Sequence, residues 1–261
     1  NHHDLGALGA AVSEAALRRQ IKILQSFGCN AIRTSHNPPA PELLTLADKM
    51  GMLVMDEAFD CWQYGKKEYD YGHLYFHWHE RDIESLVCRD RNHPSIILWS
   101  TGNETEEEYH PWMGTARHLT EVVHRFDRTR PVTFGASYPS KSGMNGTELQ
   151  VDVHGMNYAA GCYGGPHFYG EFLNKPGHEH LSGFSSESSS TMSSRGEYFP
   201  RKFHVTSYAL HQPGWGGLVD EECAALDRYP AICGEFVWTG FDYLGEPTPF
   251  NSDNSVLLNN K

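Results

Sequence analysis

Short apolar segments alternate with amphipathic segments along most of this chain. The apolar segments have the length of buried strands, and Leu17, Ile21 and Leu24 show the helical spacing of a segment between them. Strict alternation of strands and helices implies a parallel sheet, because each helix returns the chain to the same end. We count seven strands and a strand remnant at residues 1–4. This pattern predicts an α/β fold, a (β/α)₈ TIM barrel with its first strand largely missing from this chain.

The predicted strands are bounded by polar or turn residues. They cover residues 30–37, 52–60, 95–104, 131–136, 151–158, 180–187 and 231–243. Helices are predicted from about Ser13 to Gly28, over 41–50, 78–92 and 112–126, and in part of 164–175. Residues 188–230 are predicted to form a long connection.

The length of 261 residues suits one large α/β domain, and no linker divides the chain. The net charge of -12 argues against nucleic acid and anionic membranes as partners, since both require a basic face. No apolar run is long enough for a transmembrane helix. The opening residues, Asn1-His2-His3-Asp4, resemble an internal segment. We therefore expect residues 1–261 to be a barrel domain from a longer, multidomain chain.

Cysteine and histidine patterns do not indicate a metal site. The six cysteines include no CxxC pair, which favours scattered buried thiols over a disulfide or zinc framework. The pairs His77-Trp-His79 and His178-Glu-His180 lack an established ligand spacing. Histidines on the surface or lining a pocket are the favoured interpretation of both pairs.

Polar residues gather where the predicted strands end. They are His3 and Asp4; Arg33, His36 and Asn37; Asp56, Glu57 and Asp60; Asn103 and Glu104; Asn157 and Tyr158; Glu187; Trp238 and Asp242. Parallel strands end at one rim, which carries the catalytic groups of barrel enzymes. Glu104 taken alone fits a catalytic carboxylate and the start of a helix equally well. Paired carboxylates with aromatic neighbours suit glycoside hydrolysis. Trp62, Trp99, Trp215 and Trp238 could stack on sugars or pack in the core, with the core favoured for Trp99.

Four motifs together carry a family resemblance. They are Arg33-Thr-Ser-His-Asn-Pro, Asp56-Glu-Ala, Gly102-Asn-Glu104 and Phe236-Val-Trp-Thr-Gly-Phe-Asp242-Tyr-Leu-Gly-Glu. In combination they resemble the catalytic barrel of family 2 glycoside hydrolases, from residue 1 to about 249. This family holds β-galactosidases, β-glucuronidases and β-mannosidases.

The resemblance implies a retaining mechanism and a role for each matching residue. Glu104 would be the general acid/base and Glu187 the nucleophile. Glu235 is the rival nucleophile, but its early place in the last strand should put it too deep in the barrel. The remaining site residues implied by the resemblance are Asn103 on the sugar 2-hydroxyl, Tyr158 and Arg33 beside the nucleophile, Trp238 as the floor of the sugar site, and His3, His36 and Asp242 on the substrate.

No metal and no cofactor is predicted. Magnesium-dependent galactosidases of the family place a Glu and a His shortly after Asp-Glu-Ala, where this chain has Cys61 and Gln63. Those side chains are poor ligands for a cation that prefers oxygen. The predicted partner is instead an oligosaccharide or β-galactoside substrate. The sequence leaves the compartment open between bacterial periplasm and cytoplasm, and it is compatible with a homo-oligomer.

The predicted activity is that of a retaining exo-β-glycosidase, a β-galactosidase that hydrolyses terminal β-D-galactosides. The alternatives are a β-glucuronidase or β-mannosidase of the same family, or a non-catalytic sugar-binding barrel. A glucuronidase would be expected to carry a basic clamp for the sugar carboxylate, such as an Asn-x-Lys turn. The four motifs contain no such clamp.

Overall fold

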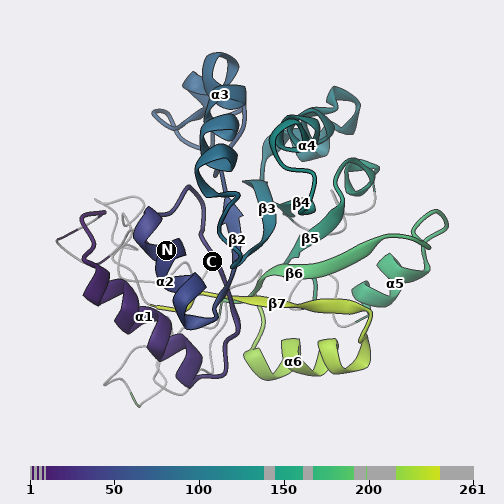
Figure 1. Ribbon diagram of the computed structural model, residues 1–261. Coiled ribbons are helices and arrows are strands. Elements are labelled where there is room, and N and C mark those ends of the chain that lie inside the picture. The colour runs from purple at the N-terminus through teal and green to yellow at the C-terminus, as the bar shows by residue number, and fades with distance from the viewer. Residues whose placement is uncertain are drawn as a thin grey trace.

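The computed structural model describes residues 2, 5, 8, 10–137, 145–160, 167–190, 198 and 216–241. Seven parallel strands form one sheet in the order of the chain. They are β1 (Ala31–Arg33), β2 (Leu53–Glu57), β3 (Ile96–Asn103), β4 (Val132–Ala136), β5 (Val153–Asn157), β6 (Ser182–Ser189) and β7 (Ile232–Trp238). Figure 1 shows the strands at the centre of the molecule and the helices around them. The predicted α/β TIM barrel is confirmed.

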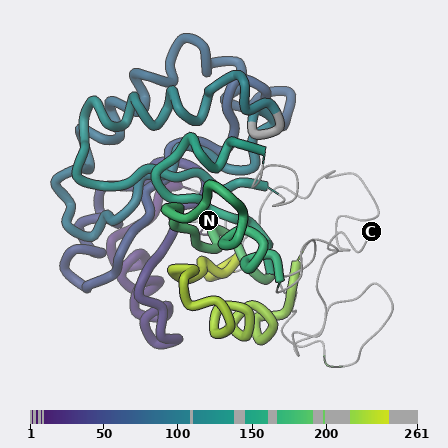
Figure 2. The backbone as a smooth tube through the Cα atoms, turned by 90° about the vertical axis from the view of Figure 1, so that its right-hand side faces the viewer, coloured from purple at the N-terminus to yellow at the C-terminus, as the bar shows by residue number. Residues whose placement is uncertain are grey.

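The outer layer consists of helices, of which the first precedes β1 and the others connect successive strands. They are α1 (Glu14–Ser26), α2 (Pro41–Met50), α3 (Gly72–Asp90), α4 (Thr115–Phe126), α5 (Phe168–Asn174) and α6 (Val219–Arg228). Short 3₁₀ helices cover Glu106–Tyr109, Pro111–Met113 and Thr147–Gln150. Seen from the side, α3 and α4 lie above the strands and α6 lies below them (Figure 2). Within the described ranges, no helix combines the length and the apolar character that crossing a bilayer requires.

The barrel is nearly closed, with a seam between β1 and β7. These two strands are the ends of the sheet, and no strand among the described residues joins them. A cavity of about 210 Å³ lies at the seam, lined in part by Ile21 and Leu24 of α1 and by Phe236 of β7. The seam is the place of a first barrel strand, in agreement with the predicted gap.

Local sequence explains where the first two helices begin and end. The Ser13 side chain accepts a hydrogen bond from the backbone N–H of Ala16 at 3.3 Å, which caps the N-terminus of α1. Pro41 occupies the first turn of α2, where a missing N–H costs nothing. Gly51 ends α2 with a φ of 72°, a left-handed conformation that glycine adopts without steric penalty.

The apolar core lies between the sheet and the surrounding helices. Trp62 and Trp99 are both part of this core, with exposed fractions of 0% and 1%. The indole N–H of Trp62 donates to the backbone oxygen of Thr101 at 2.8 Å, and that of Trp99 donates to Asp127 at 3.0 Å. Core packing is confirmed for Trp99. Stacking of Trp62 on a sugar is ruled out by its complete burial.

Two helix predictions need correction. Helix α3 begins at Gly72, six residues before the predicted start at 78. Burial of Tyr75 against Phe59 extends it, which the local acidic and aromatic sequence does not reveal. Helix α6 lies inside the predicted connection, where Glu221 accepts a hydrogen bond from the N–H of Leu218 at 3.2 Å. Acidic residues in the first turn suit a helix N-terminus, and this signal was available in the sequence.

Leu44 provides a test of the packing between α2 and the sheet. It is 0% exposed, so Leu44→Ala should lower the free energy of unfolding by about 2–5 kcal/mol, through lost burial and a residual cavity. Leu74→Ala is the matched control, because Leu74 is 52% exposed, and its effect should stay within about 0.5 kcal/mol. Denaturant unfolding followed by tryptophan fluorescence measures both. Equal losses in the two variants would contradict the described packing.

Candidate active site

Polar side chains from several strands meet at the carboxyl end of the sheet. Arg33, Glu57, Asn103 and Asn157 are the last residues of β1, β2, β3 and β5, and Glu187 lies near the end of β6. All five are buried or nearly so, although each is polar or charged. Burying such groups is costly unless they are paired, so their mutual contacts decide how the site is held together.

Arg33 is the centre of this arrangement. Its Nη1 donates to Glu187 Oε1 at 2.9 Å and to the backbone oxygen of Ser186 at 2.9 Å. Its Nη2 donates to Asn103 Oδ1 at 2.8 Å, and its Nε donates to Glu57 Oε2 at 2.8 Å. Burial opposes the charge, but the carboxylates of Glu57 and Glu187 outweigh it and raise the pKa of Arg33. The guanidinium therefore stays charged and spans two carboxylates.

Glu57 links Arg33 to two further side chains of the site. Its Oε1 accepts from His36 Nδ1 at 2.6 Å, and its Oε2 accepts from the Ser100 hydroxyl at 2.6 Å. Burial acts to raise the pKa of Glu57, but the charges of Arg33 and His36 prevail and lower it. Glu57 is thus an anion that is fully engaged with its neighbours. Its position suits orientation of Arg33 and His36, since no oxygen of this carboxylate is left free.

Glu187 has a hydrogen bond on each carboxylate oxygen. Arg33 occupies Oε1, and the hydroxyl of Tyr158 donates to Oε2 at 2.8 Å. Burial and the neighbouring charge of Glu187 raise the pKa of Tyr158 far above its usual value, so the phenol keeps the proton that it donates. The rival carboxylate Glu235 instead accepts from Cys223 at 3.6 Å and so faces α6.

Glu104 directly follows β3 and has a different environment. Its Oε1 accepts from Asn157 Nδ2 at 2.9 Å, and the same amide group donates to Asn103 Oδ1 at 3.0 Å. Burial and the negative charge of Glu187 raise the pKa of Glu104, and the hydrogen bond from Asn157 only partly offsets them. Glu104 therefore favours the protonated form more than an exposed glutamate does.

Two site residues have left-handed backbones. Glu104 has a φ of 44° and Tyr158 a φ of 57°, and each follows the asparagine that ends its strand. Such conformations cost a non-glycine residue on the order of 1–2 kcal/mol, and they concentrate at functional sites. In both cases the turn brings the side chain into contact with the polar cluster instead of continuing the strand.

A glycine makes room for the centre of the site. A Cβ atom placed on Gly135 of β4 would lie 2.7 Å from Asn103 Oδ1 and 2.8 Å from Arg33 Nη2. Any side chain there would collide with the contact between Arg33 and Asn103. Gly135 was not among the predicted site residues, because nothing in the local sequence shows which side chains cross β4.

The other predicted site residues divide into two groups. His36 and Trp238 lie face to face, with ring centroids 5.2 Å apart and an angle of 4° between the planes. His36 Nε2 also lies 3.4 Å from Glu187 Oε1, which places this ring pair beside the carboxylates. His3 and Asp242 lie outside the described residues, as does Trp215.

Three contributors besides Gly135 were missing from the predicted set. Glu57 and Asn157 stand among the polar strand ends, but the sequence assigns neither of them a role in the site. The Ser186 hydroxyl donates to Asn157 Oδ1 at 2.6 Å, and its backbone oxygen accepts from Arg33. Position at a strand end was a usable signal for Glu57 and Asn157. Ser186 lies in a serine-rich run, so nothing in the local sequence distinguishes it from its neighbours.

Magnesium-dependent members of the resembled family have metal ligands at two positions shortly after Asp-Glu-Ala. The side chains that this chain has there do not suit a hard cation. Cys61 is 1% exposed, and burial raises the pKa of its thiol to about 11, so it stays protonated. The Gln63 amide nitrogen donates to the sulfur of Met113 at 3.9 Å. Neither side chain offers the anionic oxygen that magnesium prefers. We assign no chemical step to a metal here.

Comparison with known proteins agrees with this geometry. Residues 1–253 match the family model described as glycosyl hydrolases family 2, TIM barrel domain. A β-galactosidase of Bacteroides ovatus, BoGH2A, is 36% identical over 95% of this chain and 34% of its own length. A putative β-glucuronidase of Formosa agariphila is 30% identical over 94% of this chain and 25% of its own length.

A solved β-glycosidase structure from Bacteroides vulgatus is also similar. It is 31% identical, with a TM-score of 0.77 over 94% of this chain and 34% of that one. This chain thus spans about a third or less of the length of the relatives named here. The strand-end cluster and the match over residues 1–253 lead to one conclusion: the chain belongs to glycosyl hydrolases family 2, as a TIM barrel domain of that family.

Proposed function

We propose that this barrel is the catalytic domain of a retaining exo-β-glycosidase that acts on β-D-galactosides. One observation carries the proposal. Two carboxyl groups, Glu104 and Glu187, lie in the same cluster with unequal environments. The raised pKa of Glu104 suits a proton donor, and the hydrogen bonds to Glu187 from Arg33 and Tyr158 suit an anion.

In the first step Glu187 attacks the anomeric carbon of the sugar. A covalent bond forms between a Glu187 oxygen and that carbon, and the bond to the leaving oxygen breaks. Glu104 gives its proton to the leaving oxygen, so the aglycone departs as an alcohol. Arg33 and Tyr158 hold the attacking carboxylate in one orientation, which reduces the entropy lost on reaching the transition state.

In the second step a water molecule replaces Glu187 on the sugar. Glu104, now ionised, takes a proton from the water, whose oxygen bonds to the anomeric carbon as the bond to Glu187 breaks. Glu187 also becomes neutral while it is esterified, which removes the charge that raised the pKa of Glu104. Glu104 then gives up its proton more readily, as a general base requires.

The remaining cluster suits recognition of one terminal sugar. Trp238 stacked on His36 presents an aromatic surface next to the carboxylates, and sugars pack well on such surfaces. Asn103 lies between Arg33 and Asn157, where its amide group could bond a sugar hydroxyl. A galactoside is favoured because BoGH2A, the most similar of the two curated relatives named above, is a β-galactosidase.

A panel of nitrophenyl glycosides tests the substrate. Turnover of the β-galactoside by the intact polypeptide should exceed that of the β-glucuronide and β-mannoside. The panel needs the glucuronide because Asn259-Asn260-Lys261 spells Asn-x-Lys, outside the described residues, although the four family motifs contain no such pattern. Preference for another β-glycoside would replace galactose with that sugar as the proposed substrate. Turnover of none would support a non-catalytic barrel.

Substitutions of the two carboxylates should have different effects. Glu187→Gln removes the nucleophile and should lower kcat by at least about 10⁴-fold with every leaving group. Glu104→Ala should lower kcat/KM by about 10²–10⁴-fold with a poor leaving group, and much less with dinitrophenolate, which needs little protonation. Azide should then accelerate the Glu104→Ala variant. Its product should be the β-glycosyl azide, because azide attacks the glycosyl-enzyme from the face that water uses.

The stereochemistry of the azide product decides between the two roles. Glu187→Ala with azide should give the α-glycosyl azide, since the anion then takes the place of the nucleophile. An α-azide from Glu104→Ala would reverse the assignment. Glu235→Gln serves as the control carboxylate, because Glu235 faces α6, and it should retain most of the activity.

The pH profile should report the environment of Glu104. As a general acid it must be protonated, so kcat/KM should fall as pH rises through its raised pKa. Asn157→Ala removes a hydrogen bond that favours the charged form, so the pKa of Glu104 should rise further. The alkaline limb of kcat/KM should therefore move to higher pH. Asn174→Ala, a control on the surface of α5, should leave the limb in place. A shift to lower pH in Asn157→Ala would contradict the assignment.

A further inference from the structure

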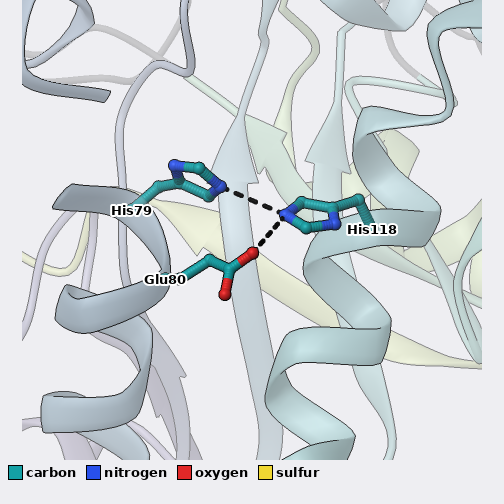
Figure 3. A group of neighbouring side chains, drawn as sticks. All are labelled: His79, Glu80 and His118. Atoms are coloured by element: carbon teal, nitrogen blue, oxygen red, sulfur yellow. Dashed lines mark hydrogen bonds and ion pairs between the residues drawn. The ribbon is translucent and has the colours of Figure 1, made fainter. Parts of the chain in front are cut away.

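We propose a zinc site on the outside of the barrel, formed by His79 and Glu80 of α3 and His118 of α4. Figure 3 shows the three side chains pointing toward one another from the two helices. Their nearest ligand atoms all lie within 4.8 Å of one another, and all three residues are half-buried. The site departs from the sequence prediction of no metal, because the partner of His79 is His118, 39 residues away in the chain, and not His77.

The contact between the two imidazoles carries the argument. His79 Nδ1 lies 2.6 Å from the backbone oxygen of Tyr75. A carbonyl oxygen can only accept, so Nδ1 carries the proton, and Nε2 of the neutral ring presents a lone pair. That lone pair faces His118 Nε2 at 3.1 Å. In the neutral ring, Nε2 is thus the nitrogen of His79 that can bind a metal.

His118 Nε2 lies between two acceptors. It is 3.1 Å from His79 Nε2 and 3.2 Å from Glu80 Oε1. A single N–H on this nitrogen can point well at only one of them, whereas one cation can serve all three atoms. Ligands about 2.0–2.1 Å from a tetrahedral zinc lie about 3.3–3.4 Å apart, close to these two spacings.

Supporting contacts already orient two of the three ligands. The Tyr75 carbonyl fixes the tautomer of His79, and the Tyr75 ring stacks on the imidazole with centroids 4.4 Å apart. The other Glu80 oxygen accepts from Arg125 at 2.9 Å, which leaves Oε1 turned toward His118. Such outer hydrogen bonds are typical of metal ligands. Two imidazoles and one carboxylate suit zinc, with water as the fourth ligand.

A metal at this position would join α3 to α4. Helix α3 connects β2 to β3, and α4 connects β3 to β4. The catalytic step proposed above does not use the metal, so loss of the site and loss of the glycosidase activity are separate outcomes. The expected role is to hold the two helices together.

Cobalt(II) and zinc binding to the intact, untagged polypeptide test the site. Cobalt should give the strong visible bands of a tetrahedral complex, and zinc should displace it. Equilibrium dialysis should find one equivalent of zinc that His79→Gln and His118→Gln bind at least about 100-fold more weakly. Zinc should also slow hydrogen exchange in α3 and α4 of the unsubstituted protein.

His124→Gln is the matched control. His124 lies on the same helix as His118 and pairs with Asp152 at 2.8 Å, and among the described residues no third metal-binding side chain joins this pair. This variant should bind zinc and cobalt as the unsubstituted protein does. Glu80→Gln provides a second test with little risk to folding, since that side chain is 45% exposed, and it should weaken binding. Equal zinc affinity in the unsubstituted protein and His79→Gln, or cobalt spectra without tetrahedral bands, would overturn the proposal.

Discussion

The buried guanidinium of Arg33 is the interaction on which the rest of the site depends. It contacts a carboxylate from β2, an amide from β3 and a carboxylate from β6, so one side chain joins strands that are distant in the sequence. Burying this cation without its anions would cost a large amount of free energy, and so would burying either anion without the cation. These charges are therefore mutually dependent, and the ends of the strands must keep their register.

This charge arrangement also separates the properties of the carboxyl groups. Glu57 and Glu187 both accept hydrogen bonds from Arg33, whereas Glu104 accepts one from the neutral amide of Asn157. Among the described residues no cation bonds Glu104 directly, so burial and the negative charge of Glu187 raise its pKa. Which carboxyl group at this rim favours the charged form therefore depends on which side chains Arg33 contacts. The left-handed backbones of Glu104 and Tyr158 turn these side chains toward the polar cluster, an orientation that a regular strand would not give them.

The outer layer has a different chemistry from the rim. The contacts of His79, Glu80 and His118 link neighbouring helices, and they involve none of the residues that surround Arg33. Histidine spacing along the chain gave no indication of this group, because α3 and α4 are separated by β3. Packing of helices on the barrel brings the ligands together. The site therefore depends on the fold as much as the carboxylate cluster does.

The sequence by itself determined the alternation of strands and helices, and with it the parallel barrel. Hydrophobic periodicity and glycine or proline boundaries are local properties, so they can be read without the fold. It also marked Arg33 and Glu104 through motifs at strand ends. Glu187 and Tyr158 were marked by their strand-end positions and by the family resemblance. Only the tertiary structure decided that Glu57 and Asn157 complete the cluster, that Gly135 leaves room for it, and that Trp62 is buried in the core. Contacts across the barrel join residues many positions apart, and no local pattern specifies which side chains will meet.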